Sequence, residues 1–542
     1  MQTFVCFGRN TMQVYILPYH GKCDFMINSI VEAVFQHAQQ QPQRSAILFD
    51  DQSLSYGQLY TQIEQFALAL KAWGLQPGDR VGLFLENCPS FVVAYLGTHL
   101  AGGIVVLVNP QYRQVELNHI IHDAGVRLCV TSAAGGEALQ TLAIPTLTTL
   151  VIVGTMDRAP SSTSSLEHIA FDTFVTRGQG HDEPLAMPAL EAPALIGYTS
   201  GTTGRAKGAL LCHRNLVANI TSLTTAWHWT EQDRLLLTLP LFHAHGLMVG
   251  MHGTLFKGSN VILRRKFDAA DCLATLKRDP TITLFFGVPT MYARLLAEAK
   301  KQGVPDHLPR LFVSGSAPLS AQLFEDFART FGQSILERYG MTETIMNLTN
   351  PYLGERRAGT VGGPFPGQEA RVVDVRTRQP LPSGEIGEIE VRGPHVFKGY
   401  WNRPEATAEA FTPDGWFKTG DLGWCSDDGY FTITGRAREL IISGGYNVYP
   451  REVEDVLETH PDVAEAAVVG MPDSDLGEQV VAVIVPVKGH VPNAADIIAF
   501  CREQLASYKK PRQVIFVDTL PRNALGKVQK PVLVEQLKST TM

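Results

Sequence analysis

The chain has 542 residues, more than one hydrophobic core normally supports, so we expect two or more domains. A net charge of −7 and the lack of a dense Lys/Arg run argue against a nucleic-acid partner. Hydrophobic residues make up 45% of the chain, but no apolar stretch is long and unbroken enough to predict a membrane span.

The first 25 residues lack both the apolar core of a signal peptide and a clear periodicity, and a regular pattern starts at Met26. We therefore expect residues 1–25 to be a disordered extension or a misassigned start, and we expect no secretion. The eight cysteines are scattered without the spacing of a metal site or a disulfide framework. This distribution is typical of reduced thiols in a cytoplasmic protein.

From residue 46 the chain alternates short apolar strands with helical patterns. In the first part of this pattern, strands are predicted at residues 80–86, 104–108 and 126–131, and helices at residues 89–100 and 115–124. This alternation predicts βαβ units and a largely parallel sheet covered by helices. A second set begins near residue 194, with strands predicted at residues 261–263, 283–286 and 311–313.

After residue 358 the pattern changes to short alternating strands between Gly/Pro turns, as in residues 384–393 and 429–434. These strands predict a small β-barrel subdomain. The predicted fold class is therefore α/β, with a large N-terminal domain of two αβ-layered subdomains plus the barrel over residues 26–437. A small mobile α+β domain is predicted to follow over residues 438–542, where strands and helices again alternate.

Residues 198–208 read YTSGTTGRAKG. Glycines and hydroxyl side chains after a strand suit a loop that wraps a polyphosphate with its backbone N–H groups, and Lys207 can neutralise phosphate charge. Ala206 stands where a Walker A motif needs glycine, so this is not that motif. The alternative is a Ser/Gly-rich linker.

Three further positions offer suitable chemistry, each with a plain alternative. Glu343, which ends the segment ERYGMTE, can ligate a hard cation or be a solvated loop carboxylate. Asp421 can accept both hydroxyls of a ribose, although Thr-Gly-Asp is common in turns. Lys527 follows a loop glycine and is otherwise a surface lysine.

The order and spacing of these motifs resemble the acyl-activating, adenylate-forming superfamily over residues 28–540. Its motifs here are Y-T-S-G-T-T-G-x-x-K-G, Y-G-M-T-E, T-G-D, G-R, G-G-x-N-V-x-P and P-R-x-x-x-G-K. Within the superfamily the chain is most similar to malonyl-CoA synthetases, through residues 240–246, 287–295 and 337–352. The resemblance implies an ATP-dependent acid–CoA ligase. An acyl-adenylate and pyrophosphate form first, and coenzyme A then displaces AMP; Mg²⁺ accompanies the ATP.

The resemblance also implies roles for individual residues. Those implied to bind ATP or AMP are Thr199, Ser200, Gly201, Thr202, Thr203, Gly204, Lys207, Gly315, Ser316, Ala317, Glu337, Arg338, Tyr339, Gly340, Met341, Thr342, Asp421, Arg436 and Lys527. Glu343 would bind Mg²⁺, and the residues implied to be catalytic are Thr199, Lys207, His243, Glu343 and Lys527. After a rotation about Arg438, the residues brought to coenzyme A would be Ser443, Gly444 and Gly445.

A dicarboxylate such as malonate or methylmalonate brings a second negative charge into the pocket, and its burial needs a cation. The resemblance assigns that role to Arg294, and His243 and Ser314 are further pocket residues. A surface arginine in a salt bridge is the alternative for Arg294. In related enzymes the lysine that matches Lys527 is a target of acetylation, which implies an acetyltransferase and a deacetylase as partners.

Two other functions stay open. The first is a medium- or long-chain fatty acyl-CoA ligase or an aryl acid–CoA ligase of the same fold. The second, from another class, is a non-catalytic nucleotide-binding protein. Both a monomer and a homodimer fit the sequence.

Overall fold

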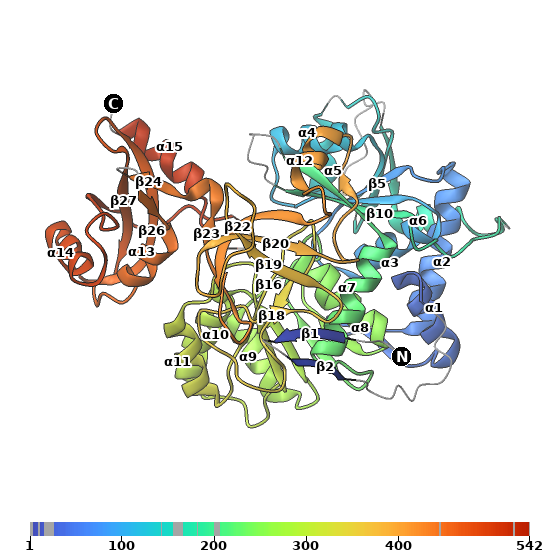
Figure 1. Ribbon diagram of the computed structural model, residues 1–542. Coiled ribbons are helices and arrows are strands. Elements are labelled where there is room, and N and C mark those ends of the chain that lie inside the picture. Colours follow the sequence, from blue (N-terminus) through green and yellow to red (C-terminus); the bar gives the residue numbers. More distant parts are fainter. Residues whose placement is uncertain are drawn as a thin grey trace.

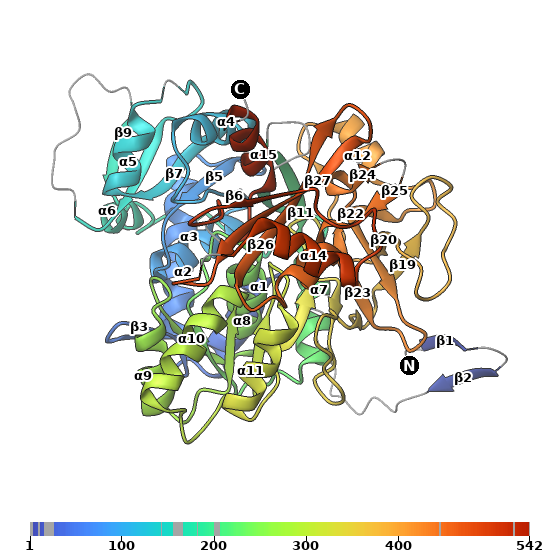
Figure 2. The same ribbon diagram turned by 90° about the vertical axis from the view of Figure 1, so that its left-hand side faces the viewer.

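A computed structural model describes residues 27–142, 144–155, 166–181, 183–199, 206–443, 446–490, 492–523 and 526–540, with the backbone of residues 4–8 and 11–15. Two large sheets, a small antiparallel sheet and a separate C-terminal sheet organise these residues (Figure 1). The C-terminal unit lies to one side of the large body in Figure 1 and in front of it in Figure 2.

The first large sheet has the strand order β21-β11-β10-β6-β5-β7-β8-β9 and is parallel from β10 to β9. Its strands are β5 (Arg80–Phe84), β6 (Ile104–Leu107), β7 (Val126–Ser132), β8 (Thr149–Val153), β9 (Glu167–Ala170), β10 (Pro193–Thr199), β11 (Lys207–Cys212) and β21 (Gly399–Tyr400). Its helices are α2 (Tyr56–Trp73), α3 (Pro89–Leu100), α4 (Gln114–Ala124), α5 (Ala133–Gln140) and α6 (Phe171–Thr176). The elements predicted here are confirmed to within two residues at each end.

The second large sheet has the order β18-β17-β16-β15-β14-β12-β13-β3-β4 and is parallel from β16 to β3. Its strands are β3 (Ser45–Phe49), β4 (Gln52–Ser55), β12 (Arg234–Leu237), β13 (Asn260–Leu263), β14 (Leu284–Gly287), β15 (Leu311–Ser314), β16 (Leu336–Tyr339), β17 (Leu348–Thr349) and β18 (Gly363–Pro364). The helices of this part are α1 (Ile30–Gln40), α7 (His213–Ala226), the π-helix η1 (His245–Met251), α8 (His252–Lys257), α9 (Ala269–Arg278), α10 (Pro289–Gln302) and α11 (Ala321–Phe331).

Asn87, a buried residue that follows β5, joins the two large sheets at the edge where their parallel strands end. Its amide donates to the backbone carbonyls of Leu239 and Arg264, each at 2.9 Å, and accepts from the N–H of Leu241 at 2.8 Å. Leu239 and Arg264 follow β12 and β13, so one amide fixes the loops of both sheets to each other. Replacing it would leave three buried backbone groups without a partner.

The small sheet contains β19 (Glu369–Val373), β20 (Gly387–Arg392), β22 (Phe417–Cys425) and β23 (Phe431–Arg436), all antiparallel, and α12 (Pro404–Ala410) precedes β22. Its antiparallel pairing agrees with the alternating sequence pattern. In the described residues its outer strands β19 and β23 are not paired with each other. The unit is therefore an open sheet and not the closed barrel that the short strands predict.

The C-terminal unit has its own hydrophobic clusters on the two faces of its sheet. Its elements are β24 (Ile441–Ser443), β25 (Tyr446–Val448), α13 (Pro450–Leu457), β26 (Val463–Asp473), β27 (Gly477–Pro486), α14 (Ala494–Gln504), β28 (Gln513–Phe516) and α15 (Lys530–Thr540). The boundary predicted between residues 437 and 438 falls inside the 3-10 turn η2 (Ala437–Glu439). The predicted mobility of this unit stays a prediction.

Within the segment 1–25, β1 (Phe4–Gly8) and β2 (Thr11–Tyr15) pair as an antiparallel hairpin, and its other residues lie outside the described part. Whether this segment is an extension or a misassigned start stays open. Among the described residues, no helix has the length and apolar character needed to cross a bilayer.

Three buried histidines and a tyrosine from helices α3, α7 and α8 lie close together. The ring of His99 lies 4.4 Å from that of Tyr95 and 4.8 Å from that of His213, between centroids, and the Nε2 atom of His252 lies 3.0 Å from the Tyr95 hydroxyl. In each histidine the Nδ1 atom is buried without a hydrogen-bond partner. Burial lowers the pKa of His213 to about 4 and that of His252 to about 3, and it also lowers the pKa of His99.

The protein should therefore lose stability in acid. Because these histidines have lower pKa values in the folded than in the unfolded chain, their stabilising effect is complete above pH ~6.5 and declines as the pH falls below it. Each histidine contributes at most about 1.4 kcal/mol per pH unit to the slope of the unfolding free energy against pH. His252→Gln, which keeps a hydrogen bond to Tyr95, should have a shallower slope of unfolding free energy between pH 6.5 and 4.5 in urea titrations. Equal slopes for the two proteins would show that this cluster does not cause the acid sensitivity.

Candidate active site

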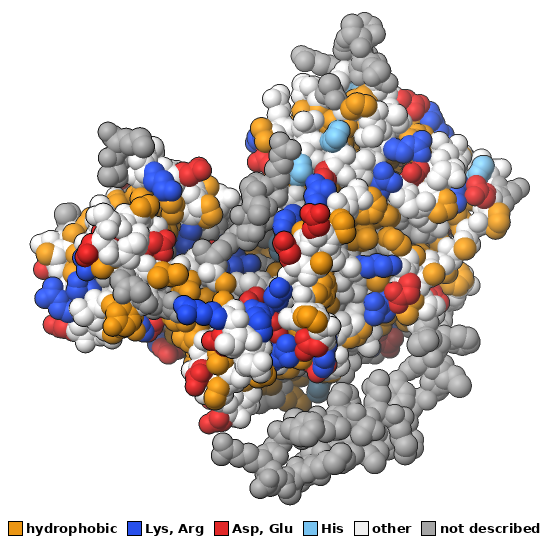
Figure 3. All heavy atoms as spheres, turned by 45° about the horizontal axis from the view of Figure 1, so that its top comes forward, with side chains coloured by type: hydrophobic (Ala, Val, Ile, Leu, Met, Phe, Trp, Pro, Cys, Tyr) orange, Lys and Arg blue, Asp and Glu red, His pale blue; other side chains and the backbone are white. Residues whose placement is uncertain are grey.

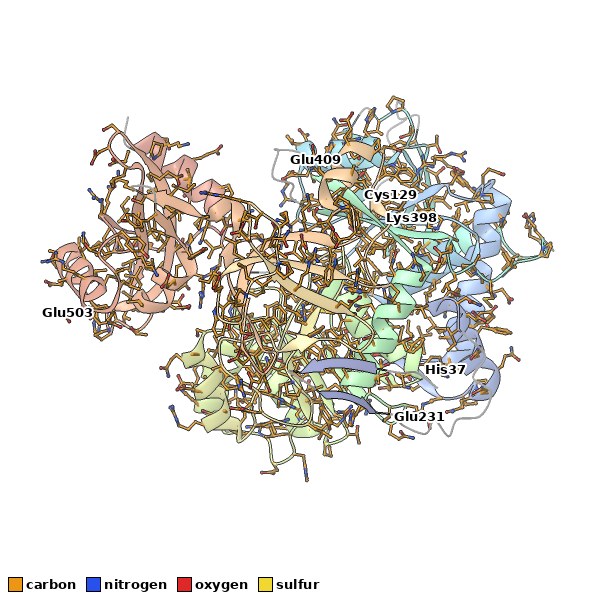
Figure 4. All side chains as sticks on the ribbon, viewed as in Figure 1. His37, Cys129, Glu231, Lys398, Glu409 and Glu503 are labelled. Atoms are coloured by element: carbon orange, nitrogen blue, oxygen red, sulfur yellow. The ribbon has the colours of Figure 1, made fainter. Side chains whose placement is uncertain are left out.

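A cavity of about 1340 Å³ lies where the first large sheet, the small sheet and the C-terminal unit meet. Its wall includes the end of β10, the start of β11, helix α4, the loop after β16, and Asn523, Lys527 and Gln529. The space-filling view shows a hollow between the C-terminal unit and the large body (Figure 3). Glu409, at the end of α12, marks the cavity's edge beside α4 (Figure 4). Ligands of open α/β sheets bind at such strand ends.

Glu343 is a buried carboxylate in the wall of this cavity. Its Oε1 atom accepts hydrogen bonds from the hydroxyls of Thr199 at 3.3 Å and Tyr400 at 3.1 Å. The Lys207 ammonium lies 5.4 Å from the centre of the Tyr400 ring. Burial raises the pKa of Glu343, whereas its hydrogen bonds favour the ionised form. Both hydroxyls contact the same oxygen, so they fix the orientation of the carboxylate.

Asp421 is another buried carboxylate, at the point where β22 pairs with β23. Its Oδ1 atom lies 2.6 Å from the Nε atom of Arg436, and its Oδ2 atom accepts a hydrogen bond from the Tyr339 hydroxyl. The neighbouring Asp421 charge raises the pKa of Arg436. An ionised carboxylate has about four acceptor positions, so Asp421 keeps capacity for ligand hydroxyls.

Arg338 extends from β16 to the cavity wall and is buried. Its Nε and Nη2 atoms have no hydrogen-bond partner, and no carboxylate of the described residues lies within 4 Å of its guanidinium. Burial lowers the pKa of Arg338 to about 9, so it remains charged at neutral pH. Gly315 leaves room for this side chain, since a Cβ atom there would lie 2.5 Å from the Arg338 Cζ atom.

Two histidines flank Ala244 in the same part of the wall. His243 is half-buried and accepts a hydrogen bond on Nδ1 from the N–H of His245 at 3.4 Å. His245 begins the π-helix η1, and its buried Nε2 atom has no partner. Burial lowers the pKa of both imidazoles, that of His243 to about 4, and the charge of Arg338 acts in the same direction. Both histidines are therefore neutral near pH 7, and Arg338 is the cation of this region.

Lys527 reaches the cavity from the C-terminal unit. Its backbone N–H donates to the Asn523 side chain at 3.0 Å, which closes a tight loop. Gly526 has φ +77°, a conformation that favours glycine, and a Cβ atom there would lie 3.0 Å from the Thr290 hydroxyl on α10. The loop thus packs against the large body with the lysine at the cavity.

The sequence pattern of the AMP-binding enzymes matches residues 34–401, and that of the AMP-binding enzyme C-terminal domain matches residues 452–527. The chain belongs to the AMP-binding enzyme family. A malonate–CoA ligase of Arabidopsis thaliana is 34% identical over 94% of this chain and 89% of its own. A long-chain-fatty-acid–CoA ligase of Bacillus subtilis is 36% identical over 91% and 92%. The crystal structure of ATP-bound MatB from Rhodopseudomonas palustris is 39% identical, covers 95% of this chain and 100% of its own, and superposes with a TM-score of 0.86.

This AMP-binding enzyme is thus an AMP-forming acyl-CoA ligase of the adenylate-forming superfamily, as its motifs predict, with ATP and coenzyme A as co-substrates. Its substrate is a small-molecule carboxylic acid. The relatives act on different acids at similar identity, so similarity alone does not select the acid.

Of the predicted site residues that the structure describes, more than half line one cavity. The predicted residues that line the cavity are Thr199, Lys207, His243, Ser316, Arg338, Gly340, Met341, Thr342, Glu343, Arg436 and Lys527. The predicted residues Ser314, Gly315, Ala317, Glu337, Tyr339, Asp421 and Ser443 are described but are not among those that line it. Ser200, Gly201, Thr202, Thr203, Gly204, Gly444, Gly445 and the Arg438 side chain lie outside the described residues. Their predicted roles stay predictions.

Two of the predicted site residues do not have the positions that we expect from their roles. Arg294 is exposed on α10 and is not among the residues that line the cavity. Glu337 points to the other side of β16, where its Oε1 atom accepts from the N–H of Leu319 at 2.9 Å. Burial raises the pKa of Glu337 to about 8, and the charge of Arg451 from the C-terminal unit opposes that shift.

Tyr400 is a site residue that sequence reasoning missed. It lies in the segment FKGYW, which contains no charge pattern or loop signature that points to the Glu343 carboxylate. The pairing of β21 with β11 places it there, because Tyr400 is the partner of Ala209, two residues after Lys207. Only the register of two strands that are 190 residues apart could have identified it.

Tyr400→Phe removes one hydrogen bond from the ionised form of Glu343, so the pKa of that carboxyl should rise further. The acid limb of the pH profile of kcat/KM for ATP should then move to higher pH, and the KM for ATP at pH 7 should rise by up to about tenfold. Tyr430→Phe, which removes a surface hydroxyl bonded to the Glu355 carbonyl, is the matched control. An acid limb at the same pH in native enzyme and Tyr400→Phe would contradict this role of Tyr400.

Proposed function

We propose that this enzyme joins malonate, or methylmalonate, to coenzyme A, with ATP converted to AMP and pyrophosphate. The observation that carries the proposal is the buried, unpaired guanidinium of Arg338 at the cavity wall. A fatty acid has one carboxylate, which reacts, and its chain needs an apolar wall. A dicarboxylate brings a second carboxylate that needs a cation.

Arg338 suits that second carboxylate in three respects. Its planar fork of N–H donors matches a carboxylate, and two of its nitrogens lack partners. The histidines at 243 and 245 are neutral, so they can offer hydrogen bonds without competing as counter-ions. An ion pair formed with the ligand would offset the cost of keeping this charge away from water, which amounts to several kcal/mol.

This proposal moves the acid-binding role from Arg294 to Arg338. Arg294 is exposed, and a surface ion pair contributes little binding energy because water and salt screen it. Its predicted role stays a prediction, and the experiment below separates the two arginines.

In the proposed first step, a carboxylate oxygen of the acid attacks the α-phosphorus of ATP, and the bond to the β-phosphate oxygen breaks to release pyrophosphate. Lys207 and Thr199 would bind the phosphates that leave, and Lys527 would neutralise charge at the α-phosphate. Asp421 and Arg436 would bind the ribose, and Tyr339 would pack on the adenine.

A magnesium ion fits beside Glu343, because a buried carboxylate with one oxygen fixed by hydroxyls is a suitable ligand. Mg²⁺ usually takes its remaining ligands from phosphates and water. No cluster of three or more His, Cys, Asp or Glu side chains that could hold a metal occurs in the described part of the chain. When bound, the ion would neutralise phosphate charge.

In the proposed second step, the sulfur of coenzyme A gives up its proton and attacks the acyl carbon, and the bond to the phosphate oxygen of AMP breaks. Lys527 would have left the cavity by rotation of the C-terminal unit about Arg438, which would bring the segment from Ser443 to Gly445 to the thiol.

AMP release with ATP, Mg²⁺ and coenzyme A should be fastest with malonate or methylmalonate in a panel that includes hexanoate and an aryl acid. Arg338→Leu should lower kcat/KM for malonate by about 100-fold or more, since it removes one partner of a buried ion pair, while ATP affinity stays within about threefold. Arg294→Leu should stay within about twofold of the native enzyme, as for other exposed ion pairs.

Loss of malonate turnover in Arg294→Leu alone would instead support the role predicted for Arg294. Faster AMP release with hexanoate than with malonate would contradict the dicarboxylate proposal itself. Circular dichroism of both variants shows whether each is folded.

A further inference from the structure

Helix α4 contacts both strands that carry the predicted phosphate-binding residues. Strands β10 and β11 pair so that Thr199 lies opposite Lys207, and the residues just before them are Tyr198 and Ala206. The Nε2 atom of His119 on α4 lies 2.8 Å from the Ala206 carbonyl. Since a carbonyl only accepts, this nitrogen carries the proton.

The second contact lies one helical turn further along α4. The Tyr198 hydroxyl donates to the Oδ2 atom of Asp123 at 2.8 Å. His119 and Asp123 are four residues apart, so both project from the same face of the helix. The rings of His119 and Tyr198 also meet edge to face, with centroids 6.1 Å apart.

Asp123 is itself fixed from the opposite side. Its Oδ1 atom lies 2.5 Å from the Nη2 atom of Arg403, which precedes α12. Arg403 follows β21, the strand that carries Tyr400 next to β11. The contacts therefore connect α4 with both strands and with the residue that precedes α12.

We propose that His119 and Asp123 are positioning residues that set Thr199 and Lys207 for the triphosphate of ATP. The His119 bond fixes the backbone of Ala206, and the Asp123 bond fixes the side chain of Tyr198, each one residue before a phosphate-binding side chain. A shift of either strand would alter the distances from Thr199 and Lys207 to Glu343 and Tyr400, now 3.3 and 5.4 Å. Catalytic effects of such small displacements are large because binding geometry sets the rate. The inference rests on the proposed roles of Thr199 and Lys207 and is independent of which acid is used.

The test measures steady-state KM values for ATP and for the acid, and the inhibition constant of pyrophosphate. His119→Leu and Asp123→Ala should each raise the KM for ATP and the inhibition constant of pyrophosphate by about tenfold, with the KM for the acid within about twofold. His119→Gln, which keeps an N–H donor, should restore most of the loss. His307→Leu, an exposed histidine outside the cavity wall, is the matched control and should behave like the native enzyme.

A purely structural role predicts a different result: lower thermal stability and a lower kcat, with unchanged KM for ATP in the folded fraction. That outcome, or an equal rise in the KM values of ATP and acid, would overturn the proposal. Lys207→Ala, measured in parallel, separates the positioning role of His119 and Asp123 from the phosphate-binding role of Lys207. If it raises the KM for ATP and the α4 variants do not, only the positioning role fails. If none of these variants changes the KM for ATP, the proposed phosphate role of Lys207 fails as well.

Discussion

The proposed function of this enzyme depends on one physical constraint, which is the buried charge of Arg338. Its guanidinium is shielded from water, two of its nitrogens lack partners, and no carboxylate of the described residues pairs with it. Such a group is costly unless an anion joins it. The residues around Arg338 accommodate its guanidinium but do not neutralise its charge. Gly315 leaves room for the side chain, and the nearby histidines at 243 and 245 are neutral. A second carboxylate on the substrate is the simplest anion that completes this arrangement.

The rest of the site is built by joining elements that are distant in the sequence. Asn87 connects the loops of the two large sheets, and β21 brings Tyr400 from the small-sheet region to the strand that carries Lys207. Asp421 and Arg436 come from paired strands of the small sheet. Lys527 comes from the C-terminal unit, which has its own hydrophobic clusters. Binding, positioning and charge neutralisation are thus divided among parts that fold around separate cores.

The sequence predicted the α/β class, the βαβ elements of the first sheet and eleven of the residues that line the cavity, because motif order identifies the family and periodicity identifies elements. It did not predict Tyr400, His119 or Asp123 as site residues, since their positions depend on strand register and on helix packing across the sheet edge. The resemblance assigned Arg338 to the nucleotide, and its burial without partners for two nitrogens became visible only in the structure. The short strands of the small sheet predicted a closed barrel, but strand length in the sequence does not reveal whether the outer strands β19 and β23 pair with each other.

The most direct test of the central claim compares malonate with its monomethyl ester in native enzyme and in Arg338→Leu. The ester keeps the reacting carboxylate and nearly the same length but lacks the second charge. We expect native enzyme to prefer malonate by about 100-fold or more in kcat/KM, and we expect Arg338→Leu to reduce this preference to about threefold or less. A preference that is equally large in both proteins, or absent from native enzyme, would contradict the claim that Arg338 binds the second carboxylate.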